Sequence, residues 1–504
     1  MKLLKEIILI GQVIILGSCT IIPPAAAPAV TPDSITQAIT FPVLTERNRL
    51  LGALTAERTC YDVTYYNLDI SIDPENKYIK GFVDIHASAA RDFSKLQIDL
   101  AQTMILNKIQ FGSVELEYQR IEDAVFIDFP KMIKGQDFSF RVYYEGTPRA
   151  AKRPPWDGGF VWEKDKKGRP YISVTCEGDG ASLWWPCKDH ISDEPDSMRM
   201  SYTVPEELIC VANGRLENKK SLSDGKITYT WVVKNPINNY NVSLQLGYYV
   251  LVQDTLQRQD KIEYLNHYVL DYHAEVAREH FKQARGILHF FEDKFGEYPW
   301  WNDGFKLVEV SYLGMEHQSA VTYGNNFRNR KKGRSWLGAY HGIVDGLLFH
   351  ETAHEWWGNS VTAEDPAHMW IHEGMAVYSE AMFMEERLGY DVAIDFLLLK
   401  RRSIKNKLPI VGPENENYWA FGDSYNKGAW IMHTLRTVID NDDLWFNILK
   451  SFAVNNRRSH VKTEHFRDLV NTSTGIDFTL FFDQYFYKSE IPTFEYEQTG
   501  NQIY

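Results

Sequence analysis

A run of five residues in the second half of the chain has the spacing of a metal site: positions 350–354 are His-Glu-Thr-Ala-His. If this run is helical, His350 and His354 project from one face, one turn apart, so that both imidazoles reach the same ion. Glu351, between them, is then placed to hold a water molecule rather than to bind the ion. A catalytic zinc keeps one of its four positions open for water, so the pattern requires a third protein ligand.

The third ligand that the sequence offers is Glu373, in a segment (370–378) with the pattern of a second helix. We predict that His350, His354 and Glu373 hold one Zn²⁺ per chain, although the same set accepts other divalent ions. The alternative is an amphipathic helix with polar residues on its wet face. Apolar neighbours (Leu-Leu-Phe before the motif, Trp-Trp after it) make that alternative costly, because unpaired His and Glu would be buried.

The wider sequence resembles a known family. The segments His-Glu-Thr-Ala-His-Glu-Trp-Trp-Gly-Asn-Ser-Val-Thr at 350–362 and Trp-Ile-His-Glu-Gly at 370–374 are similar to the M1 zinc aminopeptidases, the gluzincins that include aminopeptidase N and leukotriene A4 hydrolase. The resemblance implies a multi-domain α+β fold, in which an N-terminal antiparallel β saddle domain precedes a thermolysin-like, mainly α catalytic domain. It also implies an enzyme that removes N-terminal residues from peptides.

An upstream segment, Leu-Gly-Met-Glu-His at 313–317, stands where the M1 family has Gly-x-Met-Glu-Asn. By that resemblance, Gly314 and Met315 lie on an edge strand and offer their backbone to the substrate, and Glu316 binds the substrate's free α-ammonium. The alternative for Glu316 is an ordinary carboxylate at the end of a strand. Leu313 and His317 depart from the family pattern, which leaves the shape of the pocket for the first side chain open.

Two further residues take roles implied by the same resemblance. Glu177, ten residues before Cys187, corresponds to a loop residue that binds the ammonium together with Glu316; the alternative is a solvated loop carboxylate. Tyr425, in Tyr-Asn-Lys-Gly, corresponds to a tyrosine whose hydroxyl hydrogen-bonds the oxyanion. Its alternative is an ordinary aromatic residue, since the chain has 28 tyrosines.

Two histidines near the third ligand differ from the family pattern. His368 and His372 stand where the family usually has Asp and Asn, respectively. Either one is expected to hydrogen-bond a ligand or to add a polar group near the metal. A fourth protein ligand from either would close the site and abolish catalysis, and the family geometry directs both away from the ion.

The first part of the chain after the linker has a β pattern. From 57 to 255, apolar residues alternate with polar ones, as at 66–72 and 138–144. Alternation of this kind, with turn signals between the runs, predicts a predominantly antiparallel sheet domain.

From residue 256 the pattern becomes mainly helical, and we predict that 256–488 is the catalytic domain, with a helix over 272–297 and a strand at 305–310. The tail, 489–504, is predicted to hold a single strand at 491–496. Longer M1 enzymes continue into a helical C-terminal domain. We therefore expect a short form whose active site is more open, or is closed by a partner subunit.

Residues 1–19 have the features of a lipoprotein signal. A basic start precedes the apolar run 7–16, which is too short to span a membrane, and Leu-Gly-Ser-Cys at 16–19 resembles a bacterial lipobox. This implies diacylation of Cys19 and an enzyme anchored in the bacterial cell envelope, facing the periplasm or at the cell surface. The alternative is an ordinary cleaved signal peptide. Residues 20–56 are predicted to be a Pro/Ala-rich tether and linker.

Composition argues against one class of partner and does not decide whether the cysteines form disulfides. The formal net charge of −13 argues against nucleic acid as a partner. Outside the signal, Cys60, Cys176, Cys187 and Cys210 have no metal-ligand spacing. In an oxidising compartment Cys176 and Cys187 could form a disulfide, and buried free thiols are an equally good interpretation.

The predicted reaction is hydrolysis of the first peptide bond of a peptide with a free N-terminus. Glu351 would act as general base toward a zinc-activated water, and Tyr425 would stabilise the oxyanion. Two alternatives stay open: an epoxide hydrolase-like activity on the same site, and a non-catalytic surface lipoprotein scaffold. Intact Glu351 and Tyr425 count against the scaffold, whereas the missing C-terminal domain and the departures at Leu313, His317 and His368 count for it.

Overall fold

The computed structural model of the chain describes residues 41–258, 261–329, 342–419, 422–492, 498–499 and 502–503. The predicted signal with Cys19, the first half of the linker and most of the predicted strand 491–496 lie outside these residues. No helix in the described part of the chain is both long and apolar enough to cross a membrane.

The described end of the predicted linker is helical rather than extended. It holds α2 (Glu46–Gly52) and the start of α3 (Ala56–Thr59). Thr45 caps α2 by accepting a hydrogen bond from the backbone N–H of Asn48, whose side chain in turn accepts one from the N–H of Thr45. This reciprocal capping and the burial of Leu51 fix a segment that composition alone placed in a tether.

The first half of the described chain is built on an eight-stranded sheet, as the alternating pattern predicted. In spatial order its strands are β13 (Arg215–Ser221), β14 (Lys226–Val233), β11 (Ser197–Pro205), β1 (Tyr61–Asp73), β2 (Tyr78–Ala89), β8 (Asp137–Gly146), β4 (Met104–Phe111) and β5 (Val114–Glu115). All of the pairs are antiparallel except β1 with β11, which run parallel. The alternate residues Tyr66, Leu68, Ile70 and Ile72 of β1 are fully buried.

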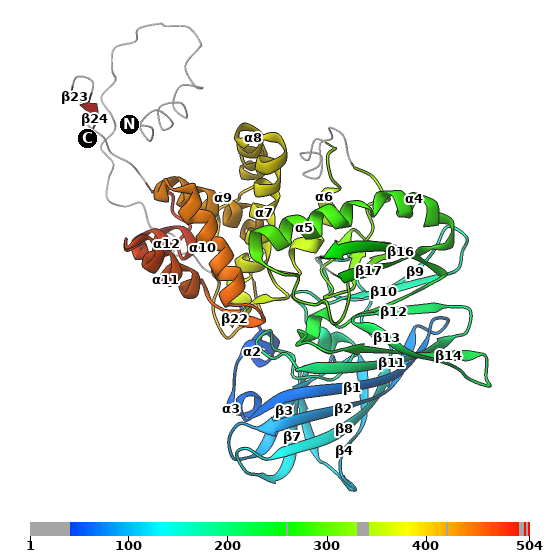
Figure 1. Cartoon of the computed structure of the whole chain (residues 1–504). Helices are drawn as coiled ribbons and strands as arrows, with labels where there is room; N and C mark the ends of the chain where they lie inside the picture. Colours follow the sequence, from blue (N-terminus) through cyan, green and yellow to red (C-terminus); the bar gives the residue numbers. More distant parts are fainter. Residues whose placement is uncertain are drawn as a thin grey trace, which may run out of the picture. The chain divides into compact units, whose positions relative to one another are not determined.

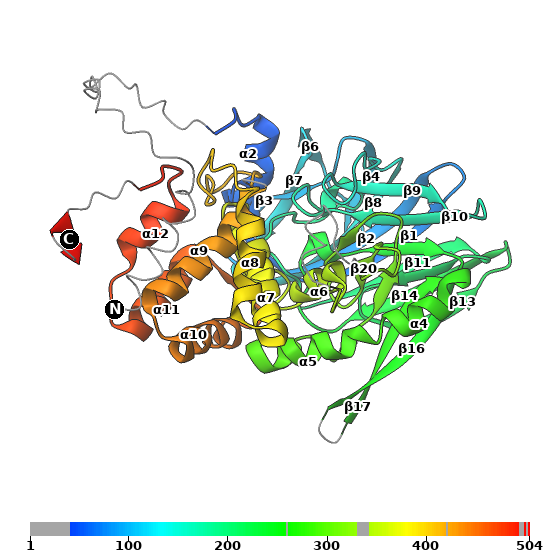
Figure 2. The same cartoon turned by 90° about the horizontal axis from the view of Figure 1, so that it is seen from above.

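Two smaller sheets complete this half. One contains β3 (Phe93–Asp99), β7 (Ala124–Met132) and β6 (Tyr118–Ile121), and the other contains β12 (Ile209–Ala212), β15 (Leu244–Gly247), β10 (Pro170–Thr175) and β9 (Gly159–Lys164). Figures 1 and 2 both show β9 and β10 on the side of the chain opposite to the helices α10–α12.

A five-stranded sheet begins the second half. Its order is β16 (Tyr249–Arg258), β17 (Lys261–Leu270), β18 (Leu307–Glu309), β20 (Val321–Tyr323) and β19 (Gly314–Met315). β16 runs through residue 255, where the sequence placed the domain boundary. β19 is an edge strand, so one side of its backbone is not paired within the sheet.

The helix predicted over 272–297 is divided into α4 (Ala274–His280) and α5 (Gln283–Phe295). No glycine or proline marks the break. Phe281 lies at the turn and is buried against Tyr323, with the ring centroids 5.2 Å apart. Tertiary packing of this ring therefore decides a helix end that local sequence does not signal.

The other helices follow in order and carry the candidate site. They are α6 (Gly346–Ala353), α7 (Trp370–Leu388), α8 (Tyr390–Arg401), α9 (Asp423–Ile439), α10 (Asp442–Asn455), α11 (Thr463–Thr474) and α12 (Thr479–Phe486). Between them, β21 (Val361–Ala363) pairs in parallel with β22 (Ser459–Val461), and a short hairpin, β23 (Gln498–Thr499) with β24 (Gln502–Ile503), follows α12.

Helices α7 and α9 cross closely at two glycines. A Cβ placed on Gly374 would lie 3.0 Å from the Cα of Gly428, and one placed on Gly428 would lie 2.9 Å from the Cα of Gly374. At distances this short, a side chain at either position would push the two helix backbones apart. Because Glu373 precedes one glycine and Tyr425 lies nearly one turn before the other, this crossing brings the two functional side chains together.

Candidate active site

The two histidines of the motif lie at the end of α6. The helix begins at Asp345, whose carboxylate accepts hydrogen bonds from the backbone N–H groups of Leu347 and Leu348. His350 lies on the last turn and His354 caps the helix, and their Nε2 atoms are 3.3 Å apart. The predicted i, i+4 arrangement is therefore present, with both imidazoles almost fully buried.

Glu373, on the first turn of α7, completes a triangle of donor atoms. Its Oε2 lies 3.4 Å from the Nε2 of His350 and 3.5 Å from the Nε2 of His354. Ligands bound tetrahedrally to zinc at about 2.0–2.1 Å must lie about 3.3–3.4 Å from one another. The three atoms thus have the chemistry and the spacing that a zinc ion requires, and they leave a fourth position open.

The outer nitrogen of each histidine is held by a hydrogen bond. The Nδ1 of His350 lies 2.7 Å from the Oε1 of Glu380, and the Nδ1 of His354 lies 2.9 Å from the backbone oxygen of Trp357. The Nζ of Lys400 lies 3.1 Å from the other oxygen of Glu380. Since each Nδ1–H donates outward, the Nε2 lone pairs point into the triangle, as metal ligation requires.

The carboxylates around His350 change its titration. Burial lowers the pKa of His350, but the hydrogen bonds to Glu373 and Glu380 outweigh burial and raise the pKa to about 10. A metal ion would displace that proton, because only the neutral imidazole binds a metal.

Glu351 is buried beside the triangle, on the side of β19. A Cβ placed on Gly314 would lie 2.9 Å from its Oε1, so the glycine leaves room for the carboxylate. Burial raises the pKa of Glu351 well above its ordinary value, His350 opposes this shift, and Glu316 adds to it. A carboxylate with a raised pKa accepts a proton from water more readily than an exposed one does.

Tyr425, on α9, reaches the opposite side of the triangle. Its ring stacks on His350, with the centroids 6.2 Å apart and an interplanar angle of 17°, and its hydroxyl is hydrogen-bonded to Glu373. Burial and the charge of Glu373 raise the pKa of Tyr425 well above its ordinary value. The hydroxyl therefore keeps its proton and can donate it in a hydrogen bond.

Two further carboxylates face each other beyond the triangle. Glu316 follows β19 and accepts a hydrogen bond from the hydroxyl of Tyr240 at 3.2 Å. Glu177 follows β10, and its Oε1 is buried without a hydrogen-bond partner among the described residues. Burial and then the charge of Glu316 raise the pKa of Glu177 well above its ordinary value. Two crowded acidic groups of this kind favour a cation between them.

The segment that follows α6 positions Glu316. The side-chain amide of Asn359 donates to the backbone oxygen of Glu316 at 2.9 Å. The backbone N–H of Ser319, which has a positive φ of 59°, donates to the Oε1 of Glu355 at 2.8 Å. The candidate metal ligands and Glu316 are thus fixed to one another.

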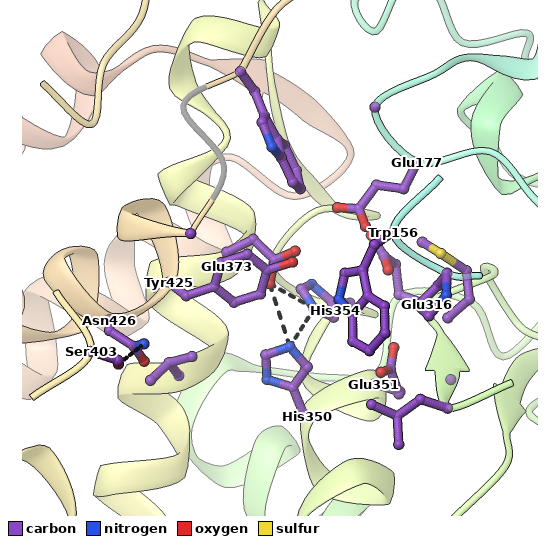
Figure 3. A pocket seen from close by; sticks show the side chains of 18 of the residues that line it. Trp156, Glu177, Glu316, His350, Glu351, His354, Glu373, Ser403, Tyr425 and Asn426 are labelled. Carbon is purple, nitrogen blue, oxygen red and sulfur yellow. Dashed lines mark hydrogen bonds and ion pairs between the residues drawn. The ribbon is translucent and has the colours of Figure 1, made fainter. Parts of the chain in front are cut away.

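The donor triangle, Glu351, Tyr425, Glu316 and Glu177 line one pocket with a volume of about 800 Å³. Figure 3 shows His350, His354 and Glu373 near its centre, with Glu177 and Glu316 to one side and Ser403 and Asn426 to the other. The sequence predicted nine site residues: Glu177, Gly314, Met315, Glu316, His350, Glu351, His354, Glu373 and Tyr425. The structure brings all nine together at this pocket.

The two histidines near Glu373 do not join the donor triangle. The Nε2 of His372 accepts a hydrogen bond from the N–H of Ala363 at 2.9 Å. The ring of His368 lies 2.9 Å from the Oγ1 of Thr463 and 3.2 Å from Glu414. Neither closes the fourth position.

Three residues of the site were not predicted from the sequence. Glu380 lies seven residues after Glu373, two helical turns along the same face, and this spacing was a usable signal. Lys400 and Tyr240 reach the site from α8 and from a loop, and nothing in their local sequence indicates it. Cys60, Cys176, Cys187 and Cys210 are buried free thiols, so the candidate bridge between Cys176 and Cys187 is not formed.

Two family models match the chain. The peptidase M1 N-terminal domain matches residues 63–240, and the peptidase family M1 domain matches residues 279–485. The chain belongs to peptidase family M1. The first match contains Glu177, and the second contains the donor triangle, Glu316 and Tyr425.

Curated relatives of this M1 chain are longer. Leucyl aminopeptidase of Saccharolobus solfataricus is 22% identical over 413 residues, which cover 78% of this chain and 50% of that protein. Probable aminopeptidase 2 of Sulfurisphaera tokodaii is 22% identical over 398 residues, which cover 75% of this chain and 47% of that protein. The M1 chain thus spans about half the length of the curated relatives it matches.

Solved structures share the fold of this M1 chain. An M1 zinc metallopeptidase from Deinococcus radiodurans aligns with a TM-score of 0.70 at 21% identity, covering 86% of this chain and 95% of that one. Leukotriene A4 hydrolase from Saccharomyces cerevisiae aligns with a TM-score of 0.69 at 16% identity, covering 88% and 71%, respectively. The predicted order, a β domain before a mainly helical catalytic part, is confirmed.

Proposed function

We propose that this M1 chain is a zinc-dependent aminopeptidase that removes N-terminal residues from peptides. The observation that carries the proposal is the pair of carboxylates beside the metal-binding triangle, the buried Glu316 and the half-buried Glu177. A free ammonium group held between them would place the first peptide bond at the triangle, about one residue away. One relative in the fold comparison, the Deinococcus radiodurans protein, was solved with a Tyr-Ser-Ala substrate.

Each of the chain's own residues has a separate role in the proposed reaction. Zinc, when held by His350, His354 and Glu373, would polarise the scissile carbonyl and make a water molecule easier to deprotonate. Glu351 takes the proton of the attacking water and later delivers it to the leaving amine. Tyr425 donates a hydrogen bond to the oxygen that gains negative charge.

Substrate position follows from the edge strand and the carboxylate pair. The backbone of Gly314 and Met315 has a free edge toward the pocket, where an extended peptide can pair with it. Glu316 and Glu177 form charge-assisted hydrogen bonds to the ammonium. Because only a chain end carries that ammonium, the pocket selects an exopeptidase reaction.

The deciding experiment is a panel of aminoacyl-anilides assayed with the purified full chain, with and without chelator. We expect release that is lost on chelation and restored by Zn²⁺. In Glu351→Gln, kcat should fall by about 10²- to 10⁴-fold while zinc is still bound, because only the general base is removed. No release from zinc-loaded protein would reject the aminopeptidase.

We also propose that the chain is held in the bacterial cell envelope by a lipid on Cys19. The support is the lipobox-like sequence at 16–19, which lies outside the described residues. The Cys19→Ser variant, expressed as the full chain in a bacterium, should incorporate no labelled fatty acid, unlike the wild type. Equal labelling of the two proteins would contradict the proposal.

A further inference from the structure

One aromatic side chain at the pocket has no part in the reaction described above. Trp156 lies on the loop 147–158, between β8 and β9, and lines the same pocket as the metal-binding triangle. It is 58% exposed, whereas every other tryptophan in the described part of the chain is buried or half-buried. A large aromatic surface left open at a pocket wall is typical of a ligand contact.

The loop that carries Trp156 is closed by its own hydrogen bonds. The carboxylate of Asp157 accepts from the backbone N–H of Lys152 at 2.9 Å and of Arg153 at 2.6 Å. The N–H of Trp156 donates to the backbone oxygen of Arg153 at 3.0 Å. These bonds hold the backbone beneath the indole in one turn, so little ordering is needed when a ligand covers the ring.

A second set of contacts ties this loop to the loop of Glu177. The N–H of Gly158 donates to the Oδ2 of Asp179 at 2.6 Å, and Arg149 pairs with the same carboxylate at 3.1 Å. A Cβ on Gly158 would lie 2.7 Å from the Cβ of Asp179, so the two loops touch. Trp156 is thus fixed relative to Glu177, one of the two carboxylates placed to hold the ammonium.

The indole shares a pocket with the groups proposed to bind the first residue of a substrate. Trp156 lines the same pocket as Glu316, at the proposed ammonium end, and Glu351, at the proposed scissile bond, and Figure 3 draws the indole near both carboxylates. The first residue of a bound peptide must span the interval between these two carboxylates, since its amine and its carbonyl are one residue apart. Its side chain would therefore enter the pocket that the indole lines.

We propose that Trp156 is a specificity-determining residue that forms an aromatic wall for the side chain of the N-terminal residue. It selects aromatic and large aliphatic first residues over Ala and Gly, because only a large side chain covers the indole. Leu313, in place of the family's glycine, adds an apolar side chain to the same pocket. This inference rests on the proposed aminopeptidase activity and names its preferred substrates.

The test uses three dipeptide amides with free N-termini: Phe-Ala-NH₂, Ala-Phe-NH₂ and Ala-Ala-NH₂. The wild-type full chain, loaded with zinc, should cleave Phe-Ala-NH₂ with the highest kcat/KM. In Trp156→Ala, kcat/KM for Phe-Ala-NH₂ should fall about tenfold relative to Ala-Ala-NH₂, and Trp156→Phe should keep most of the preference. The matched control is Trp162→Ala, which removes a half-buried indole from β9 outside the pocket.

Each other outcome rejects the inference in a distinct way. If Trp156→Ala lowers all three rates equally, the indole supports structure and does not select. If it changes Ala-Phe-NH₂ relative to Ala-Ala-NH₂, it contacts the second residue. An unchanged ratio leaves the indole without a role in selection. If the zinc-loaded wild type cleaves none of the three amides, the proposed function itself fails.

Discussion

In the proposed function, two carboxylates, Glu177 and Glu316, bind the N-terminus of a peptide in this pocket. Glu316 accepts a hydrogen bond from Tyr240, the charge of Glu316 raises the pKa of Glu177, and neither carboxylate pairs with a Lys or Arg side chain in the described part of the chain. A cationic group of a substrate would therefore be a suitable counter-ion for the pair. A free α-ammonium is the group that every unmodified peptide supplies.

Replacing one of these carboxylates should separate substrates by their N-terminus. In Glu316→Gln, kcat/KM for a free-amine peptide should fall by at least about tenfold, because one charge-assisted hydrogen bond contributes about 1.5–3 kcal/mol. The N-acetylated form of the same peptide should be cleaved slowly by both proteins and equally so. If the wild type cleaves the acetylated and free peptides at the same rate, the carboxylates do not bind an amine.

The hydrogen bond from His350 to Glu380 should govern metal affinity. In Glu380→Gln, the affinity for zinc should fall by about 10- to 100-fold, because the carboxylate orients the imidazole and strengthens it as a donor. Competition with a chromogenic chelator measures this affinity without reference to turnover. Glu386→Gln, on the same helix but ion-paired with Lys294 away from the pocket, is the control and should bind zinc as the wild type does. Equal affinities in all three proteins would contradict the role given to Glu380.

Helix α6, which carries candidate metal ligands, is held at its N-terminus by a single capping residue. Asp345 is fully buried, caps α6 and also accepts hydrogen bonds from the Tyr323 hydroxyl at 2.6 Å and the Asn325 amide at 2.9 Å. One side chain thus fixes the helix that holds two metal ligands to the sheet that carries the edge strand.

Removing this cap should loosen the site as a unit. Asp345→Ala should lower the free energy of unfolding by about 2–4 kcal/mol, since the cap and at least two buried donors lose their partner. Its zinc affinity should fall as well. Asn441→Ala, at the exposed cap of α10, should cost about 1 kcal/mol and leave zinc affinity unchanged. Denaturant unfolding and zinc competition check both values, and equal effects of the two substitutions would contradict a special role for Asp345.

The site residues differ in how well the sequence alone predicts them, depending on the elements that carry them. His350, His354 and Glu351 were predictable because one helix fixes their spacing, and Glu373 because a ligand was missing. Glu177 and Tyr425 needed the family resemblance, since β10 and α9 meet the zinc helix only in the folded chain. Trp156 was not predicted, because its loop has no motif and its position depends on a contact with Asp179.

At the scale of the whole molecule, buried neutral histidines link stability to pH. Burial lowers the pKa of His190, His267 and His317 to about 3. In the unfolded chain a histidine titrates near its ordinary value of about 6.5. Between these two pKa values the unfolded state binds more protons than the folded state. The contribution of these histidines to the free energy of unfolding is therefore at its full value above pH 6.5 and falls as the pH drops toward 3.

A single substitution should reduce this acid sensitivity. His317 is fully buried, and neither ring nitrogen has a hydrogen-bond partner in the described residues. His317→Leu should leave stability near neutral pH unchanged or higher, and should reduce the loss of stability below pH 6 by up to about 1.4 kcal/mol per pH unit. Urea unfolding at pH 7.5, 5.5 and 4.5 would measure both effects. A parallel pH profile in wild type and variant would show that His317 does not titrate on unfolding.

The carboxylate pair joins the two matched parts of the chain. Glu177 comes from the part that matches the M1 N-terminal domain, whereas Glu316 and the metal ligands come from the part that matches the catalytic domain. In the proposed reaction, the groups that act on the peptide bond thus come from one part, whereas recognition of the N-terminus needs residues of both parts. If the two matched parts separate while the catalytic part stays folded, such a hydrolase would keep the groups for hydrolysis but lose its selection of the N-terminal peptide bond.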